Sequence, residues 1–117
     1  MLKVYGYKGC STCVQAKTYL AKKQIAFDDI EITETPPSKS VLKSILKTGD
    51  YELKDLFNKS GLVYREMNLK DKLPSMSESE ALQLLASNGK LIKRPIATDG
   101  KSFTVGYKEA IYKQKWG

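Results

Sequence analysis

Residues 4–20 read VYGYKGCSTCVQAKTYL, and the rest of the fold can be worked out from this stretch. The apolar run at its start predicts a short strand, and the two glycines that follow predict a turn. Beyond the turn, apolar residues recur at the spacing of one helical face: Cys13, Ala16 and Leu20. A helix is therefore expected to begin at Cys10.

Cys10 is the predicted nucleophile. At a helix start, unpaired backbone amides and the positive end of the helix dipole stabilise an anion, and Lys8 adds a positive charge nearby. The thiolate is the reactive form of cysteine, so this position favours reactivity. Cys13 follows about one helical turn later, close enough for the two sulfurs to meet but in a more sheltered place. We therefore predict that Cys13 resolves the intermediate that Cys10 forms.

The composition limits the other uses of two close cysteines. A structural zinc needs about four thiolate or imidazole ligands, and the chain has 2 Cys and no His, so only a site shared between two chains would hold the metal. The absence of His also excludes Cys-His hydrolases and most His-based metal sites. The remaining alternative is that both cysteines are buried as small apolar residues. We expect no metal and no tightly bound organic cofactor.

The 117 residues suit a single compact domain. With 41% apolar and 28% charged residues, the composition is that of an ordinary globular protein. No apolar run approaches the roughly 20 residues of a membrane span, and the N-terminal residues do not read as a signal peptide. We expect a cytoplasmic protein, in which a disulfide between Cys10 and Cys13 is transient and not a structural cross-link.

The formal net charge of +7 is spread evenly along the chain. Residues 1–59 carry 10 basic and 7 acidic side chains, and residues 60–117 carry 10 and 6. The lysines form no basic tail. They are also not interleaved with aromatic residues, whereas many proteins that bind single-stranded nucleic acid have such an arrangement. We expect no direct nucleic-acid binding, but a lysine-rich surface that attracts anionic partners. Only two of the basic residues are arginines, Arg65 and Arg94.

The middle of the chain reads as strand and then helices. A strand at 25–32 would complete a strand-helix-strand unit with parallel pairing. Ser38 is a suitable N-cap for the next helix, which Gly49 closes. A short helix that carries Leu53, Leu56 and Phe57 is expected to stop before Gly61, and residues 62–73 read as mixed loop and helix.

The last third gives the clearest local signals. Residues 77–80, Ser-Glu-Ser-Glu, fit a capping box that starts a helix, and Gly89 ends it. Asp-Gly at 99–100 predicts a hairpin between two short strands, and a last helix is expected over about 107–115. The elements follow the order βαβ, then helices, then ββα, and a Cys-x-x-Cys pair lies beside the βαβ unit. This order predicts an α/β thioredoxin-like fold with a mixed four-stranded sheet and a helical insertion at about 38–88.

Four segments carry a resemblance that spans the whole chain. They are Tyr5-Gly6 to Cys10; Leu56-Phe57-Asn58 to Gly61 with Tyr64-Arg65-Glu66; Lys93-Arg94-Pro95-Ile96; and Val105-Gly106-Tyr107. In this order they resemble the arsenate reductase-related ArsC family, which includes the Spx-type regulators.

The resemblance implies roles for several residues. Cys10 would attack arsenate or form a mixed disulfide, with Arg65 and Arg94 beside it as an oxyanion clamp. Guanidinium groups bind tetrahedral oxyanions through paired hydrogen bonds, and a cation also lowers the pKa of a neighbouring thiol. Outside such a site, Arg65 would be a surface ion pair and Arg94 a solvated loop residue. The resemblance also implies a cis bond between Arg94 and Pro95. We assign the anion-binding site to Arg65, Arg94, Pro95, Ser11 and Thr12.

Two functions stay open at this point. Reductases of the family that use glutaredoxin have one catalytic cysteine, which is followed by Gly-Thr-Ser-Arg and preceded by a His, and they have a third arginine after the late Val-Gly. In this chain Cys10 is followed by Ser-Thr-Cys-Val, and His is absent. The residue after the Val-Gly is Tyr107. The Cys-x-x-Cys pair is typical of Spx-type redox sensors, which bind RNA polymerase. The first hypothesis is a thiol-disulfide reductase of a small oxyanion or thiol substrate, with glutathione and glutaredoxin, or thioredoxin, as electron donor. The alternative is a redox-sensing regulator that binds an RNA polymerase subunit.

Overall fold

The structure is a computed structural model that describes residues 2–117. It separates into two compact units. Unit 1 combines the chain up to Ile32 with Arg94–Gly117, and unit 2 is Thr33–Lys93. Within residues 2–117, no helix has both the length and the apolar character that crossing a membrane requires.

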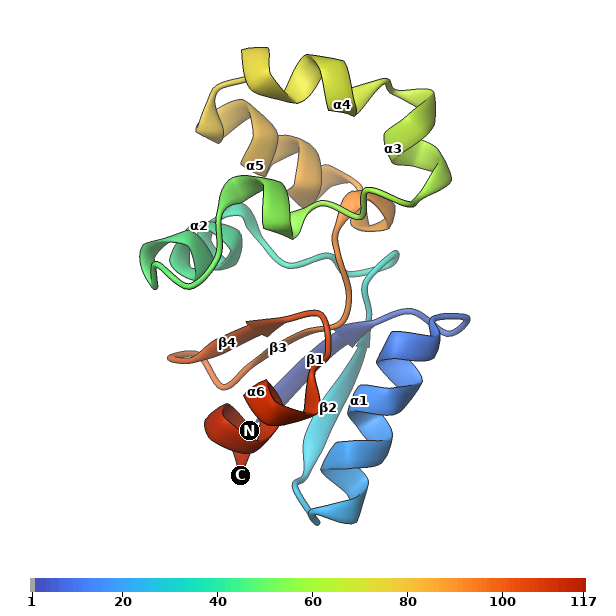
Figure 1. Cartoon of the computed structure of the whole chain (residues 1–117), viewed down its shortest axis with the longest axis vertical. Helices are drawn as coiled ribbons and strands as arrows, with labels where there is room; N and C mark the ends of the chain where they lie inside the picture. The colour runs from blue at the N-terminus through green and yellow to red at the C-terminus, as the bar shows by residue number, and fades with distance from the viewer. Residues whose placement is uncertain (1) are drawn as a thin grey trace. The chain divides into compact units, whose positions relative to one another are not determined.

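Unit 1 holds a four-stranded sheet in the order β2-β1-β3-β4 (Figure 1). Its elements are β1 (Leu2–Gly6), α1 (Ser11–Lys22), β2 (Phe27–Glu31), β3 (Ile96–Thr98), β4 (Phe103–Val105) and α6 (Glu109–Trp116). β1 pairs in parallel with β2 and antiparallel with β3, and β3 pairs antiparallel with β4. The predicted βαβ unit and the hairpin at 99–100 are confirmed.

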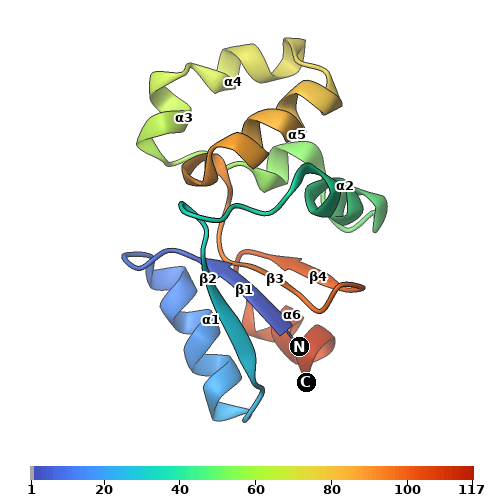
Figure 2. The same ribbon diagram turned by 180° about the vertical axis from the view of Figure 1, so that it is seen from behind.

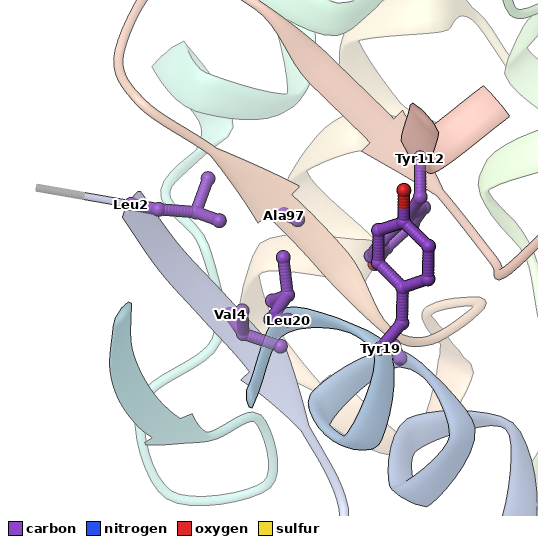
Figure 3. Close-up of a cluster of buried hydrophobic side chains, with 7 residues drawn as sticks. Leu2, Val4, Tyr19, Leu20, Ala97 and Tyr112 are labelled. Atoms are coloured by element: carbon purple, nitrogen blue, oxygen red, sulfur yellow. The ribbon is translucent and has the colours of Figure 1, made fainter. Parts of the chain in front are cut away.

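The core of unit 1 lies between the sheet and both of its helices (Figure 3). Its buried members are Leu2, Val4, Ala16, Tyr19, Leu20, Ala97 and Tyr112. β1, β3, α1 and α6 each contribute to this single cluster, so the two helices pack on the same face of the sheet. This packing fixes the direction of α1, and with it the position of the residues at its N-terminus.

β2 is shorter than the strand predicted at 25–32. Just past the end of α1, Gln24 adopts the left-handed conformation, φ 58°, and the amide of Ile25 donates to the Leu20 carbonyl at 2.9 Å. This helix-closing hydrogen bond uses the backbone amide that an earlier strand start would need. The ladder with β1 therefore begins at Phe27.

Unit 2 is helical. Its α-helices are α2 (Lys39–Lys47), α3 (Leu62–Glu66), α4 (Leu69–Lys72) and α5 (Glu78–Ser87), with 3₁₀ turns at Leu53–Leu56, Leu73–Ser75 and Gly89–Leu91. α2 and α5 pack side by side (Figure 2). The Ser38 side chain accepts from the Val41 amide at 3.2 Å, which confirms it as the cap of α2. At α5, Ser77 and Glu80 form the predicted capping box.

Two segments of unit 2 show how local geometry sets element ends. The helix predicted to carry Leu53, Leu56 and Phe57 is a 3₁₀ turn that stops at Leu56, because Phe57 is extended and pairs with Ile92 in an isolated antiparallel bridge. In the mixed segment at 62–73, Asn68 adopts the left-handed conformation, φ 53°, and separates α3 from α4.

Candidate functional site

Cys10 is the N-cap of α1, as the sequence predicts. Its backbone is extended, and its Sγ accepts a hydrogen bond from the amide of Cys13 at 3.3 Å. Its carbonyl accepts the first helical hydrogen bond, from the amide of Val14 at 3.1 Å. The side chain is half-buried. Cys10 therefore combines access from solvent with a hydrogen-bond donor directed at its sulfur.

Cys13 lies in the first turn of α1 and is 0% exposed. Its Sγ accepts a hydrogen bond from the amide of Tyr7 at 3.4 Å. Gly6 lies against it, since a β-carbon at that position would be 3.4 Å from the Cys13 sulfur. Both cysteines are free thiols. The pair thus consists of one accessible and one sheltered sulfur.

The surroundings of the two thiols shift their pKa values in opposite directions. Partial burial by itself raises the pKa of Cys10, but hydrogen bonds from the Cys13 thiol, the Cys13 amide and Arg94 outweigh it and hold the pKa below its ordinary value. Burial and the neighbouring Cys10 raise the pKa of Cys13 to about 12. At neutral pH, Cys13 is therefore a thiol that donates to Cys10, the sulfur more readily ionised. The cation named among the causes of the Cys10 shift is Arg94, which the family resemblance placed beside this sulfur, and not Lys8, which the position in the turn had suggested.

Tyr7 is a site residue that the sequence analysis missed. The Arg94 guanidinium carbon lies 4.5 Å from the centroid of its ring, within the range of a cation–π contact. The Tyr7 amide donates to the Cys13 sulfur, and its carbonyl accepts from the Cys10 amide at 3.1 Å. Tyr7 therefore touches all three groups of the thiol site. The sequence signal that could have identified Tyr7 was its position in the turn between a strand and the helix that carries Cys10.

The other predicted site residues fall in both units. Ser11 and Thr12 are the first two residues of α1, where backbone amides have no helical partner. Pro95 is buried next to Arg94, and the predicted cis bond between them is confirmed. Arg65 is an exposed residue of α3 in unit 2. Its role beside Cys10 stays a prediction.

Residues 2–117 contain no group of three or more His, Cys, Asp or Glu side chains that could hold a metal ion. The site in unit 1 is built from two sulfurs, a guanidinium and an aromatic ring. Such a set suits thiol chemistry on an anionic or sulfur-containing substrate.

Comparison with known proteins places this site in a family. The sequence pattern of the ArsC family matches residues 5–115. The chain belongs to the ArsC family. Among relatives, protein YusI of Bacillus subtilis (strain 168) is 49% identical over 115 residues, 98% of each chain. The global transcriptional regulator Spx of Streptococcus agalactiae (serotype V) is 26% identical over 93% of this chain and 78% of its own length.

A solved ArsC-like structure confirms the fold. It is described as a possible arsenate reductase from Streptococcus mutans UA159 and is 41% identical. The match covers 99% of this chain and 98% of that one, with a TM-score of 0.91. Together with the sheet order β2-β1-β3-β4, it confirms the predicted thioredoxin-like α/β fold. ArsC-family relatives thus include both a regulator and a possible reductase.

We expect Tyr7 to act by holding Arg94. Tyr7→Leu removes the ring under the guanidinium and should make Cys10 react more slowly with iodoacetamide at neutral pH, because Arg94 then spends less time beside the sulfur. Tyr7→Phe keeps the ring and should react like the wild type. The measurement is the alkylation rate of Cys10 as a function of pH in the three proteins. If Tyr7→Phe is slowed as much as Tyr7→Leu, the ring is not what positions Arg94.

Cys13 should make the folded chain less stable at high pH. The unfolded thiol ionises near its ordinary pKa of 9.0, whereas the folded thiol keeps its proton to about 12. In this window the folded state binds more protons than the unfolded state, so the free energy of unfolding falls as pH rises. Denaturant unfolding should show that the free energy of unfolding falls more steeply with rising pH in Cys10→Ser than in Cys10→Ser/Cys13→Ala. Neither variant can form the disulfide. Parallel pH profiles for the two variants would contradict the expectation.

Proposed function

We propose that this ArsC-family protein is a thiol-disulfide reductase in which Cys10 attacks the substrate and Cys13 resolves the intermediate. The observation that carries the proposal is the contrast between the two sulfurs. Cys10 is half-buried, accepts hydrogen bonds and has a lowered pKa; Cys13 is fully buried with a pKa raised to about 12. An accessible thiolate followed by a sheltered thiol is the arrangement that a two-step thiol mechanism needs.

In the first step, the Cys10 thiolate attacks the substrate. With arsenate, a sulfur–arsenic bond forms and a hydroxide, protonated to water, leaves. With a disulfide substrate, a mixed disulfide forms and one thiolate leaves. Arg94 is the guanidinium beside the sulfur that would hold the anionic oxygens or a glutathione carboxylate. We propose Arg65 as a second guanidinium for the same group, with the amides of Ser11 and Thr12 as further donors and Pro95 shaping the groove.

In the second step, the Cys13 sulfur attacks the Cys10 sulfur. The bond between Cys10 and the substrate breaks, and its electron pair leaves with the substrate, which departs as arsenite or as the second thiolate. The two protein thiols become a disulfide, so two electrons have been transferred. Once Cys10 is bonded to substrate, its negative charge no longer opposes ionisation of Cys13, one of the causes that raise the Cys13 pKa. Burial, the largest cause, remains, but loss of the contribution from Cys10 makes Cys13 easier to ionise at the stage when it must attack.

A turnover assay with the full chain tests this proposal. Arsenate is supplied with glutathione and glutaredoxin in one series and with thioredoxin and its reductase in another, since either couple can return two electrons to the disulfide. A disulfide substrate, oxidised glutathione, is assayed in parallel with the thioredoxin couple only, because glutathione as the donor would regenerate the substrate and give no net reaction. Turnover with any of these pairs, accompanied by a Cys10–Cys13 disulfide seen by mass spectrometry, supports the reductase. The absence of turnover with all of them would contradict it.

The alternative is a redox-sensing regulator, which the relationship to the global transcriptional regulator Spx favours. In this alternative a mild oxidant such as peroxide joins Cys10 to Cys13, the peroxide being reduced to water, and the disulfide changes the affinity for an RNA polymerase subunit. The test is the binding of the reduced and peroxide-oxidised chain to purified RNA polymerase. Equal affinity of the two forms, or of wild type and Cys13→Ala after oxidation, would count against the sensor.

A further inference from the structure

Val14 is an exposed apolar residue beside the thiol site. Its side chain is 56% exposed, and among residues 2–117 only Leu62 is another large apolar residue with high exposure. The Val14 amide donates to the Cys10 carbonyl at 3.1 Å, so Val14 lies one helical turn from the nucleophile. Single exposed apolar residues are common on protein surfaces. Val14, however, lies next to the accessible sulfur of the pair, where a reaction partner approaches.

The solvent face of α1 next to Cys10 carries no charge. The residues of α1 that are exposed up to Thr18 are Ser11, Val14, Gln15 and Thr18. Lys17, the charged residue of this stretch, is half-buried and pairs with Asp29 on β2 at 2.9 Å. The whole chain has 28% charged residues, and the centres of protein–protein interfaces differ from the remaining surface by a depletion of charge. The composition of this face therefore suits an interface centre.

The return of electrons to the Cys10–Cys13 disulfide takes place at Cys10. The Cys13 side chain is 0% exposed, whereas Cys10 is half-buried, so an incoming thiolate attacks the Cys10 sulfur and Cys13 is the leaving group. Burial raises the pKa of Cys13, and a leaving thiol with a raised pKa departs slowly. Exchange with a freely diffusing thiol is slow for this reason. A donor held against the protein beside Cys10 overcomes it through a higher effective concentration.

We propose that the α1 face formed by Val14, Gln15 and Thr18 docks a protein dithiol that returns electrons to the Cys10–Cys13 disulfide. This inference rests on the proposed reductase and names its electron donor by class: a folded protein with apolar side chains beside its cysteines. Glutathione is small and charged and has little apolar surface to bury on Val14. Exposed lysines at both ends of the face, Lys8 and Lys22, favour a partner whose rim is neutral or acidic.

The exchange with a protein dithiol balances in two steps. In the first, a donor thiolate forms a mixed disulfide with Cys10; the bond between Cys10 and Cys13 breaks, and Cys13 leaves with the electron pair and takes up a proton. In the second, the other donor thiolate attacks the donor sulfur bonded to Cys10, and Cys10 leaves as the thiolate. The donor has become a disulfide, and both thiols of the chain are restored by two electrons.

Reduction of the preformed disulfide by two dithiols of different size tests the proposal. Peroxide converts the full chain to the disulfide and is itself reduced to water. The rate of reduction is then followed by mass spectrometry, with reduced thioredoxin or with dithiothreitol at the same dithiol concentration. We expect thioredoxin to react faster with the wild-type chain. Val14→Ser should slow the reaction with thioredoxin about tenfold, because an apolar contact is lost, and should leave the rate with dithiothreitol unchanged.

Two further variants serve as controls. Val14→Leu keeps an apolar side chain at the same place and should react with thioredoxin at nearly the wild-type rate. Ala21→Ser makes a similar polar change at an exposed position in the last turn of the same helix, away from Cys10. It should match the wild type with both dithiols.

Three results would overturn the proposal. The first is a wild-type rate with thioredoxin no higher than with dithiothreitol. The second is equal slowing of both reactions by Val14→Ser, which would mean a change in the reactivity of the disulfide itself. The third is a dimer in analytical ultracentrifugation that Val14→Ser converts to a monomer, because the face would then be covered by a second copy of the chain.

This test is separate from that of the reductase. It starts from a preformed disulfide and needs no substrate. Absence of turnover with arsenate or oxidised glutathione, together with a Val14-dependent preference for thioredoxin, would contradict the reductase alone. Turnover without such a preference would contradict the docking face alone.

Discussion

We expect replacement of Cys10 by Ser to lower the proposed turnover by on the order of a thousandfold or more, as loss of a covalent nucleophile does in other enzymes. A serine hydroxyl is not ionised at neutral pH and cannot form a disulfide, so neither step of the proposed reaction can occur. The geometry of the helix start should survive, since a serine oxygen is also a good N-cap. The measurement is the rate of substrate reduction, alongside the far-ultraviolet circular dichroism spectrum to show that α1 is intact.

Cys13→Ser is the matched control for this prediction. It leaves Cys10 able to attack but removes the sulfur that resolves the intermediate. With oxidised glutathione, a stable mixed disulfide on Cys10 should accumulate to one equivalent per chain, visible as a mass increase. Turnover that persists in Cys10→Ser, or the absence of any adduct in Cys13→Ser, would overturn the order of steps proposed for the two sulfurs.

Replacement of Arg94 by Ala is expected to raise the pKa of Cys10 and to slow its alkylation at neutral pH by about tenfold, the effect of removing an adjacent opposite charge. The physical cause is the loss of both the hydrogen bond and the charge that Arg94 supplies to the Cys10 thiolate. Turnover should fall further than alkylation, because the same guanidinium is proposed to hold the substrate anion. The rate of iodoacetamide alkylation against pH measures the first effect and the turnover assay the second.

Two variants sharpen this prediction. Arg94→Lys keeps the charge but loses the planar fork, so it should restore part of the alkylation rate and little of the turnover. Arg65→Ala tests the role that the family resemblance implies. It should lower turnover while leaving the alkylation of Cys10 unchanged, because Arg94 is the cation beside this thiolate. A wild-type turnover rate in Arg65→Ala would remove Arg65 from the proposed anion clamp.

The sequence predicted best those features that depend on neighbouring residues. The start of α1 at Cys10, the capping box of Ser77 and Glu80, and the hairpin at 99–100 each need only a few consecutive residues, and each was correct. Element ends were harder. The β2 ladder starts later than its apolar pattern because the Ile25 amide closes α1, and Phe57 leaves its helix to pair with Ile92.

The contacts of the site were predicted only in part, because some join distant parts of the chain. The family resemblance pointed to Arg94, but nothing in the local sequence shows that its guanidinium lies on the ring of Tyr7. Likewise, helix position alone does not separate the pKa values of Cys10 and Cys13. That separation depends on the burial of Cys13, on the hydrogen bonds between the two cysteines and on Arg94, which lies just before β3. Patterns within one segment carry no information on such pairings.

The sheet order also sets a sequence of events during synthesis. β1, α1 and β2 leave the ribosome first, whereas β3 and the arginine that precedes it emerge only after the whole of unit 2. Domains fold as they emerge, so a growing chain carries both cysteines for most of its translation without Arg94, the cation that helps to lower the pKa of Cys10. The contacts that lower the pKa of Cys10 are therefore complete only when β3 pairs with β1. Until then, the Cys10 thiol of the growing chain lacks the hydrogen bond and the charge that Arg94 supplies in the folded protein.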